Sequence, residues 1–158
     1  ASLTTGEAAI AAIRVGNSKM DEDEVDPNNR YLFITPTLLG LIQDMETTKS
    51  KEVLQNFAGI RKVPQSRFYT AISQYDGSTS GEEAGGYVKD PTNGCDINFM
   101  IIEKSAVIQF EKHVAPKIIT PDQNQNADAY KFGYRNVGIA DVYDNKVAGI
   151  YLHHKAKG

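Results

Sequence analysis

The chain has 158 residues, a net charge of −3 and 41% hydrophobic residues, a balance typical of a globular protein. A chain of this length buries about 68–70% of its extended surface and needs no covalent staples. Its one cysteine, Cys95, excludes an internal disulfide, and no apolar run approaches the roughly 20 residues of a membrane span. The first residues do not read as a signal peptide. The acidic balance gives no reason to expect general affinity for a nucleic-acid backbone.

The N-terminal region predicts a helix, a turn and a strand. Apolar residues recur at helical spacing over Thr4–Met20, and Thr4 with Glu7 has the spacing of a capping box. A proline followed by two asparagines marks a turn at residues 26–29. The short apolar run Arg30–Thr35 is typical of a strand.

Two further helices are expected next. Thr35 and Pro36 form a helix start, with Thr35 as cap and Pro36 where no backbone N–H is needed, and the helix continues to about Glu46. The run Ser50–Phe57 predicts a second, shorter helix. A strand at Gly59–Val63 ends at Pro64.

The middle of the chain contrasts a polar loop with apolar strands. Gln74–Gly94 is rich in glycine, serine and acidic residues, and a loop this long is usually functional or mobile. Ile97–Ile102 is almost continuously apolar, which predicts a strand covered on both faces. Strands are expected at Ile108–Val114 and, after a break, at Pro116–Ile119.

The C-terminal third predicts a period-two strand and a hairpin. Tyr130, Phe132 and Tyr134 alternate with Lys131, Gly133 and Arg135, which indicates a strand with one aromatic face. Residues 137–143 and 146–153 flank Asp144 and Asn145, two residues that tolerate a tight turn. The predicted fold class is α+β: a mixed or antiparallel sheet with helices packed on it, plus a C-terminal β-hairpin.

The charged and histidine-containing clusters favour structural interpretations. The acidic run 21–26 lacks the spacing of a calcium loop and is better explained as a solvated helix end, with a contact to a basic patch on a neighbouring subunit as the alternative. His153 and His154 are adjacent on a strand, so their side chains point to opposite faces and do not easily bind one metal ion, even with His113.

The remaining candidates for chemistry lack their signatures. Cys95 and His113 carry no surrounding nucleophile motif, and the glycine-rich run 81–86 has no following lysine and no helix after it. Residues 67–69 and 130–135 mix aromatic and basic side chains, but half-buried sheet is the better interpretation than a nucleic-acid platform. A paired-carboxylate site is not excluded, yet nothing marks one. No catalytic, cofactor-binding or metal-binding residue is therefore assigned.

Two stretches carry a family resemblance. VPQSRFYTA at Val63–Ala71, and the text that runs from NFMIIEKSAVIQ at Asn98 to YLHHKA at Ala156, resemble the major capsid proteins of tailed phages that infect Firmicute-type bacteria. The similarity extends over most of the chain from about Met20. That family builds shells on the Hong Kong 97 capsid fold, so the resemblance implies a structural protein that is not an enzyme and needs no cofactor.

The resemblance also implies a division of the chain. Residues 1–24 would be a helical remnant of the peripheral domain, 25–127 an axial-type domain, and 128–158 strands returning to the peripheral domain. The glycine-rich loop becomes the candidate tip near the centre of a capsomer. Its candidate contact residues are Asp76, Gly81, Glu82, Glu83, Gly85, Gly86, Tyr87 and Lys89.

The implied partners are copies of the chain itself in pentamers and hexamers, together with scaffold and portal proteins and, indirectly, packaged DNA. The implied location is the virion capsid, assembled in the cytoplasm of a bacterial host. The N-terminal arm and extended loop of the family are expected to be absent, so this fragment should fold without forming shells. The alternatives are a cellular nanocompartment shell of the same fold, or a small α+β ligand-binding domain or enzyme.

Overall fold

A computed structural model describes residues 2–156 and divides the chain into two compact units. Unit 1 contains the residues up to Ala106 and those from Asn145 onward, and unit 2 is Val107–Asp144. Unit 1 combines helices with a mixed sheet, which confirms the α+β class. The boundaries of the units differ from the predicted divisions at residues 24 and 127, and the axial and peripheral labels stay predictions.

The first helix, α1, spans Gly6–Glu22 and is capped by Thr5, whose hydroxyl accepts a hydrogen bond from the Ala8 backbone N–H at 3.2 Å. The predicted cap at Thr4 is therefore wrong by one residue. Thr5 is the cap because its backbone is extended and the helical conformation begins at Gly6. α1 buries Ala9, Ile13 and Met20 on one face and packs against the two other helices and the last strand of unit 1.

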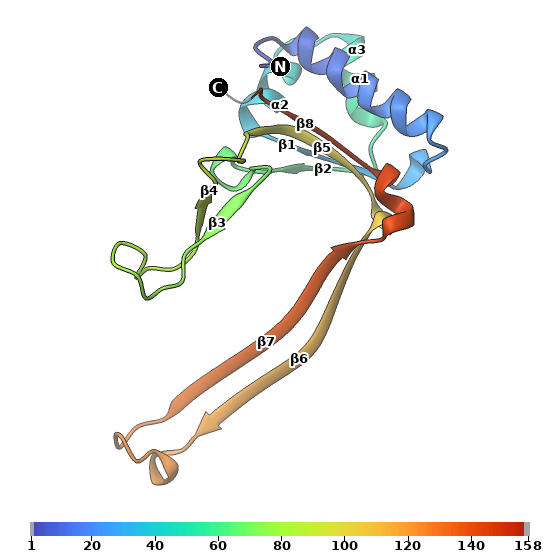
Figure 1. Ribbon diagram of the computed structural model, residues 1–158. Helices are drawn as coiled ribbons and strands as arrows, with labels where there is room; N and C mark the ends of the chain where they lie inside the picture. The colour runs from blue at the N-terminus through green and yellow to red at the C-terminus, as the bar shows by residue number, and fades with distance from the viewer. Residues whose placement is uncertain (1, 157–158) are drawn as a thin grey trace. The chain divides into compact units, whose positions relative to one another are not determined.

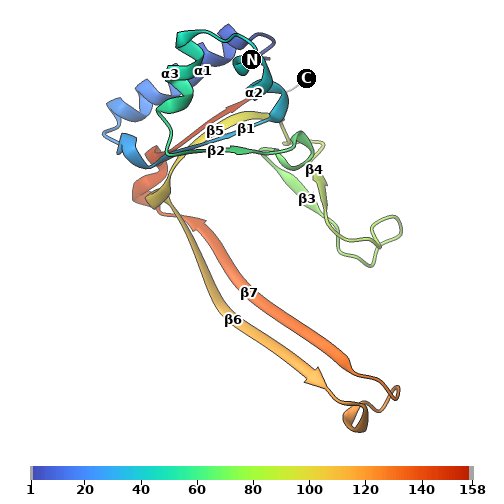
Figure 2. The same cartoon turned by 180° about the vertical axis from the view of Figure 1, so that it is seen from behind.

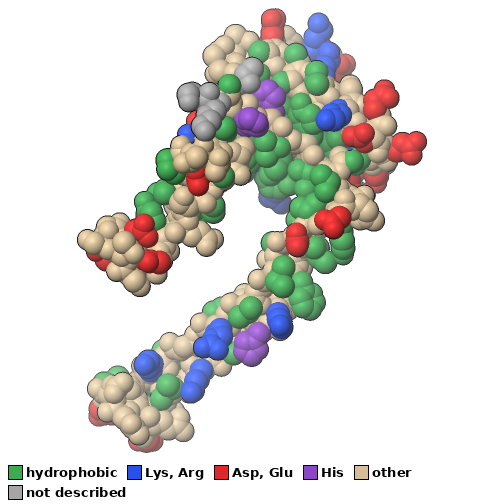
Figure 3. All heavy atoms as spheres, in the orientation of Figure 1, with side chains coloured by type: hydrophobic (Ala, Val, Ile, Leu, Met, Phe, Trp, Pro, Cys, Tyr) green, Lys and Arg blue, Asp and Glu red, His purple; other side chains and the backbone are tan. Residues whose placement is uncertain are grey.

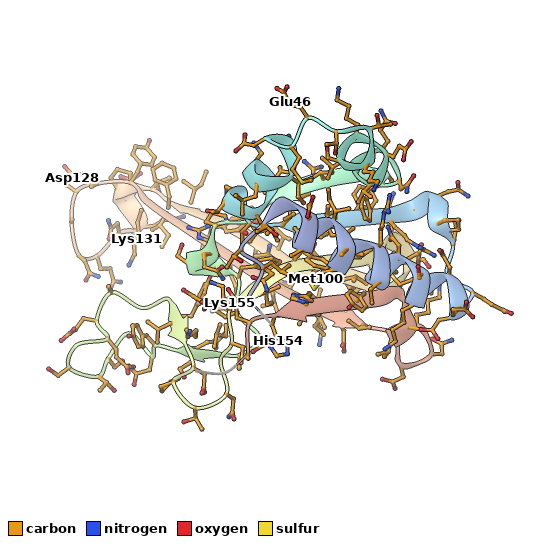
Figure 4. All side chains as sticks on the ribbon, turned by 90° about the horizontal axis from the view of Figure 1, so that it is seen from above. Glu46, Met100, Asp128, Lys131, His154 and Lys155 are labelled. Carbon is orange, nitrogen blue, oxygen red and sulfur yellow. The ribbon has the colours of Figure 1, made fainter. Side chains whose placement is uncertain are left out.

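Helices α2 (Pro36–Gln43) and α3 (Thr48–Gln55) follow the predicted order. Thr35 occupies the cap position of α2 without a side-chain bond, whereas Thr47 caps α3 by accepting from the Ser50 N–H at 3.2 Å. α2 ends before the predicted Glu46, because the chain turns there with a positive φ of 46°. Figure 4 labels this turn residue.

The sheet of unit 1 has the strand order β2-β1-β5-β8, from β1 (Arg30–Ile34), β2 (Gly59–Lys62), β5 (Ile97–Glu103) and β8 (Ile150–His154). β1 is parallel to β2 and antiparallel to β5, and β5 is antiparallel to β8. Figures 1 and 2 show the three helices gathered on one side of this sheet. The strands predicted near residues 30, 59 and 97 are confirmed.

The core of unit 1 lies between the sheet and the helices. Ile13 and Met20 of α1 meet Leu32 of β1 and Phe99 and Ile101 of β5, and all five are almost inaccessible to solvent. β5 is buried on both faces over most of its length, as its continuous apolar run predicts. Among the described residues, no helix has the length and apolar character to cross a bilayer.

A small two-stranded ribbon, β3 (Ile72–Gln74) with β4 (Tyr87–Lys89), carries the glycine-rich loop. The loop predicted at Gln74–Gly94 is thus shorter than expected, because β4 interrupts it. The described residues also include short 3-10 turns at Pro27–Asn29, Gln65–Arg67, Lys104–Ala106, Pro121–Gln123 and Asp144–Gly149.

Unit 2 is a long antiparallel ribbon of β6 (Val107–Ile119) and β7 (Lys131–Val142). The predicted C-terminal hairpin across Asp144 and Asn145 does not form: β7 pairs with β6, β8 pairs with β5, and the supposed turn is a 3-10 helix. The break predicted before Pro116 is also absent, and β6 instead shifts register between Glu111 and His113.

Candidate interaction surfaces

Within unit 2, residues 107–144, the ribbon has no third strand and no α-helix. Of its strand residues, only Ile108, Ala115, Ile119 and Val142 are half-buried, and the others are exposed. The rings of Tyr130, Phe132 and Tyr134 are 62, 74 and 69% exposed. The interpretation of residues 130–135 as half-buried sheet is therefore wrong for this chain, because β7 has one partner strand and no covering layer.

The register assigns every ribbon side chain to one of two faces, because directly opposite residues of an antiparallel pair share a face. Pro116 lies opposite Tyr134 and Ile118 opposite Phe132, so one face carries neighbouring apolar pairs. The ring of Tyr130 stacks on that of Phe132 with centroids 6.3 Å apart.

The other face of the same segment is cationic. Lys117, Lys131 and Arg135 lie on it, opposite or beside Gly133, Ile119 and Ala115. Figure 3 shows Lys, Arg and His side chains gathered along one face of the ribbon, and Figure 4 labels Lys131 near its end. Nearer unit 1 this face becomes apolar, with Phe110 opposite Ile139.

The glycine-rich loop of unit 1 is held by its own carboxylates. The Asp76 carboxylate accepts bonds from the Ser78 and Thr79 N–H groups and from the Thr79 hydroxyl, all at 2.7 Å. These bonds, the Thr79 amide first, hold the pKa of Asp76 below its usual value. The pKa of Glu83 is likewise lowered, by its own amide and by that of Gly81.

The candidate contact residues between Asp76 and Gly86 therefore belong to one acidic loop. Gly81, Gly85 and Gly86 adopt positive φ values that favour glycine, although a Cβ placed on any of them would meet no atom within 4 Å. Glu82 accepts a bond from the Asp76 N–H at 3.3 Å. Whether this loop contacts a capsomer neighbour stays a prediction.

Tyr87 and Lys89 lie on β4, at the base of this loop. Lys89 Nζ binds Asp96 Oδ1 at 3.0 Å and lies 5.8 Å from the centre of the Tyr69 ring. The bond to Asp96 raises the pKa of Lys89 and lowers that of Asp96. Lys155 approaches the second Asp96 oxygen at 3.4 Å, so Asp96 joins β4 to the end of β8. The Lys89 side chain therefore has a structural role within unit 1, in its ion pair with Asp96.

The acidic run 21–26 lies at the end of α1, as predicted, and its members have separate roles. Asp21 pairs with Arg30 at 2.7 Å. Arg30 is buried and also donates to the backbone carbonyl of Val25 at 2.6 Å. Asp26 accepts from the Asn28 N–H, which lowers its pKa, and so shapes the next turn. Asp21 and Arg30 thus bind the helix end to β1.

The three histidines lie on different elements. Asn98 donates to His153 Nδ1 at 3.0 Å, and the His153 ring stacks on Phe99 with centroids 5.2 Å apart. Burial lowers the pKa of His153. His154 follows on the opposite face of β8, where Figure 4 labels it, and His113 belongs to unit 2. Within residues 2–156, no three His, Cys, Asp or Glu side chains gather as metal ligands would.

Cys95 lies in unit 1, where its backbone N–H donates to the Thr70 hydroxyl at 2.8 Å, while His113 lies in unit 2. The sequence prediction missed the pairing of β6 with β7, which forms the ribbon surface. The polar stretch 120–129 between two strand-like runs could have indicated this hairpin, because it contains Pro121 and several Asn and Asp residues typical of a turn.

Comparison with known proteins gives one informative result. No protein-family model and no curated protein matches the chain. Among solved structures, a chain from Mycobacterium phage Che8 matches 96% of this chain with a TM-score of 0.56 at 11% sequence identity. This chain spans half the length of that one. The likeness shows a shared fold.

Proposed function

We propose that the chain is a structural subunit of a tailed bacteriophage head, a major capsid protein that works by packing against copies of itself. The observation that carries the proposal is the β6–β7 ribbon, a two-stranded sheet whose large apolar side chains, such as Ile118 and Phe132, are mostly exposed to solvent. A chain built to act alone would leave this surface in water. A subunit of a shell buries it against its neighbours.

The energetic argument follows from the size of the exposed surface. An isolated two-stranded ribbon is marginally stable in water, and large exposed apolar patches usually mark interaction sites. In a shell one contact is repeated around rings, so each contact can be modest while the assembly is stable. A ribbon that is exposed in one copy and covered in the assembly fits this arrangement.

Two further observations support the proposal. The fold resembles that of a mycobacteriophage chain, and the residues around Val63–Ala71 and in the last third resemble capsid proteins of the Hong Kong 97 fold. On this proposal the chain is located in the virion and assembles in the host cytoplasm. Its proposed partners include scaffold and portal proteins, and its association with packaged DNA is indirect.

The same proposal assigns no chemistry to the chain. Six described groups have a shifted pKa. Asp76 and Glu83 share the acidic loop, Lys89 pairs with Asp96, and Asp26 and His153 belong to other elements. A hollow of about 810 Å³ beside α1 contains none of them, and a smaller hollow of about 390 Å³ is lined by one of them, Asp26. This distribution favours a structural role over the ligand-binding or enzymatic alternative.

The test is to express the whole reading frame that contains this chain and to image the product by electron microscopy. Closed shells or rings of capsomers are expected. The matched control joins Ala106 to Asn145 through a short turn and so removes the ribbon while it keeps the sheet of unit 1. This control should fold, by circular dichroism, and should not assemble.

Three outcomes would speak against the proposal or against part of it. A stable monomer from the whole reading frame at every concentration would contradict it. Normal shells from the ribbon-deleted control would show that the ribbon is not the assembly surface. Shells that enclose a specific folded protein would favour the nanocompartment alternative.

A further inference from the structure

The outer half of the ribbon has one uncharged apolar face. We call the aromatic face the side chains of Val114, Pro116, Ile118, Tyr130, Phe132 and Tyr134. The register places the strand members of this set on one side, and the Tyr130 ring stacks on Phe132. The strand positions of this segment carry no Asp, Glu, Lys or Arg on that side, and their polar member is Asn136, opposite Val114.

The reverse of the same segment is the cationic face, formed by Lys117, Lys131 and Arg135. Two copies that met through their cationic faces would bring like charges together, which opposes association. The charge beside the aromatic face is that of Glu111, whose carboxylate accepts a bond from Asn136 at 3.4 Å at the inner end of the face. Two copies that met through the six side chains of the aromatic face would bury no charged member of that set. Electrostatics therefore favours the aromatic face for contact between identical chains.

The ribbon edge at β6 is poorly suited to adding another strand. Pro116 has no backbone N–H to donate, and the register shift between Glu111 and His113 distorts the strand. Proline, bulges and charged side chains are the features by which natural sheets block pairing at their edges. A second chain is thus better accommodated on the face of the ribbon than along β6.

The exposed area is sufficient for a specific contact. Aromatic side chains bury about 150–250 Å² each, and the three rings are 62, 74 and 69% exposed. Two copies of the three rings thus offer about 800 Å². Val114 and Ile118 add to this total and bring it towards the roughly 1,000 Å² that a biological interface needs.

We propose that the aromatic faces of two copies pack against each other about a two-fold axis, with both cationic faces directed outward. This proposal rests on the proposed function, since it names the face through which copies meet. The contact is isologous, so each side chain meets the same patch on the partner. The cationic faces then remain available to acidic surfaces of further subunits.

The test uses the 158-residue chain in analytical ultracentrifugation over a range of concentrations. The wild type should form dimers that persist or strengthen in ammonium sulfate, because apolar contact is strengthened by such salts. F132S/Y134S should raise the dissociation constant at least about tenfold, because buried aromatic anchors dominate interfaces. The matched control K117S/R135S changes the same segment on its opposite face and should still dimerise.

A labelling experiment locates the contact. In a C95S background, a thiol placed by I118C should react more slowly with maleimide as protein concentration rises. A thiol placed by K117C, the neighbouring residue on the other face, should react at a constant rate. Both positions are on the exposed ribbon, so the fold of unit 1 is preserved, and thermal melts of each variant check this.

The outcomes separate this proposal from the proposed function. Dimers abolished by K117S/R135S and by moderate NaCl, but not by F132S/Y134S, would overturn the aromatic contact and leave shell assembly intact. Protection of residue 118 at every dilution would mean that another part of the same chain covers the face, which also overturns it. A chain that stays monomeric rejects the contact, while imaging of the whole reading frame still decides the proposed function.

Discussion

The sheet of unit 1 and the ribbon of unit 2 use similar residues in opposite surroundings. Phe99 and Ile101 on β5 are fully buried, because β1 and β8 flank the strand and helices cover the sheet. Phe132 and Ile118 on the ribbon are mostly exposed, because unit 2 contains neither a third strand nor an α-helix. Apolar character alone thus does not determine whether a side chain is buried. Burial also requires a second layer, such as the helices that pack on the sheet of unit 1.

The largest effect is expected from truncating a ring in each region. Phe99→Ala should lower the free energy of unfolding by about 3–5 kcal/mol, because it leaves a cavity in the core. Phe132→Ala should change it by less than about 0.5 kcal/mol in the dilute chain, because the ring is in solvent. Urea unfolding of both variants provides the measurement. Equal losses would show that the ribbon is covered within a single chain.

A glycine pair tests how closely α1 approaches the sheet. A Cβ at Gly16 would lie 2.7 Å from the Tyr151 ring, whereas a Cβ at Gly40 in α2 meets nothing within 4 Å. Gly16→Ala should destabilise by about 1–3 kcal/mol through overpacking. Gly40→Ala should stabilise by about 0.5–1 kcal/mol, because alanine favours a helix. Thermal unfolding distinguishes the two, and stabilisation by both would indicate a loosely packed α1.

Acid should weaken unit 1 through His153. Burial lowers the folded-state pKa of His153 below the unfolded value of about 6.5, so the unfolded chain binds more protons in acid. The free energy of unfolding should therefore fall as the pH drops from 7.5 through about 6.5 and below. Urea titrations at several pH values measure this fall. It should be smaller in His153→Gln and unchanged in His154→Gln, and a wild-type profile in His153→Gln would refute the assignment.

The smallest global effect is expected at the acidic loop. Asp76→Ala removes the acceptor of the Ser78 and Thr79 amides, so these two amides should exchange faster with deuterium. The free energy of unfolding should hardly change, because the side chain is on the surface. Ser80→Ala, in the same loop, is the control. Unchanged amide exchange in Asp76→Ala would mean that the backbone alone holds the turn.

Local signals predicted local structure well. The proline at residue 36 and the apolar run from Ile97 correctly marked the start of α2 and a doubly covered strand. Strand pairing was harder, because it depends on residues far apart in the chain. Asp144 and Asn145 offered a good turn, yet β7 gains twelve partner residues in β6 and β8 gains a place beside the buried β5. Pairing over this length outweighed the local preference.

The candidate surfaces were predictable only in part. The glycine-rich loop was recognised because glycine and acidic residues gathered there, and the structure adds the hydrogen bonds that shape it. The exposure of Tyr130, Phe132 and Tyr134 was not predictable, since alternating aromatics are equally typical of a half-buried strand. Only the pairing pattern reveals that unit 2 supplies no layer to cover them.

The ribbon is an insertion between two strands that are neighbours without it. β5 and β8 pair directly, the Ser105 hydroxyl accepts a bond from Lys146 Nζ at 2.8 Å beside the junction, and Val107 lies opposite Val142 where the ribbon begins. Equal numbers of residues can therefore be removed from β6 and β7, or added to them, while unit 1 keeps its register. The length of the ribbon can therefore change, in related proteins or by engineering, without redesign of unit 1.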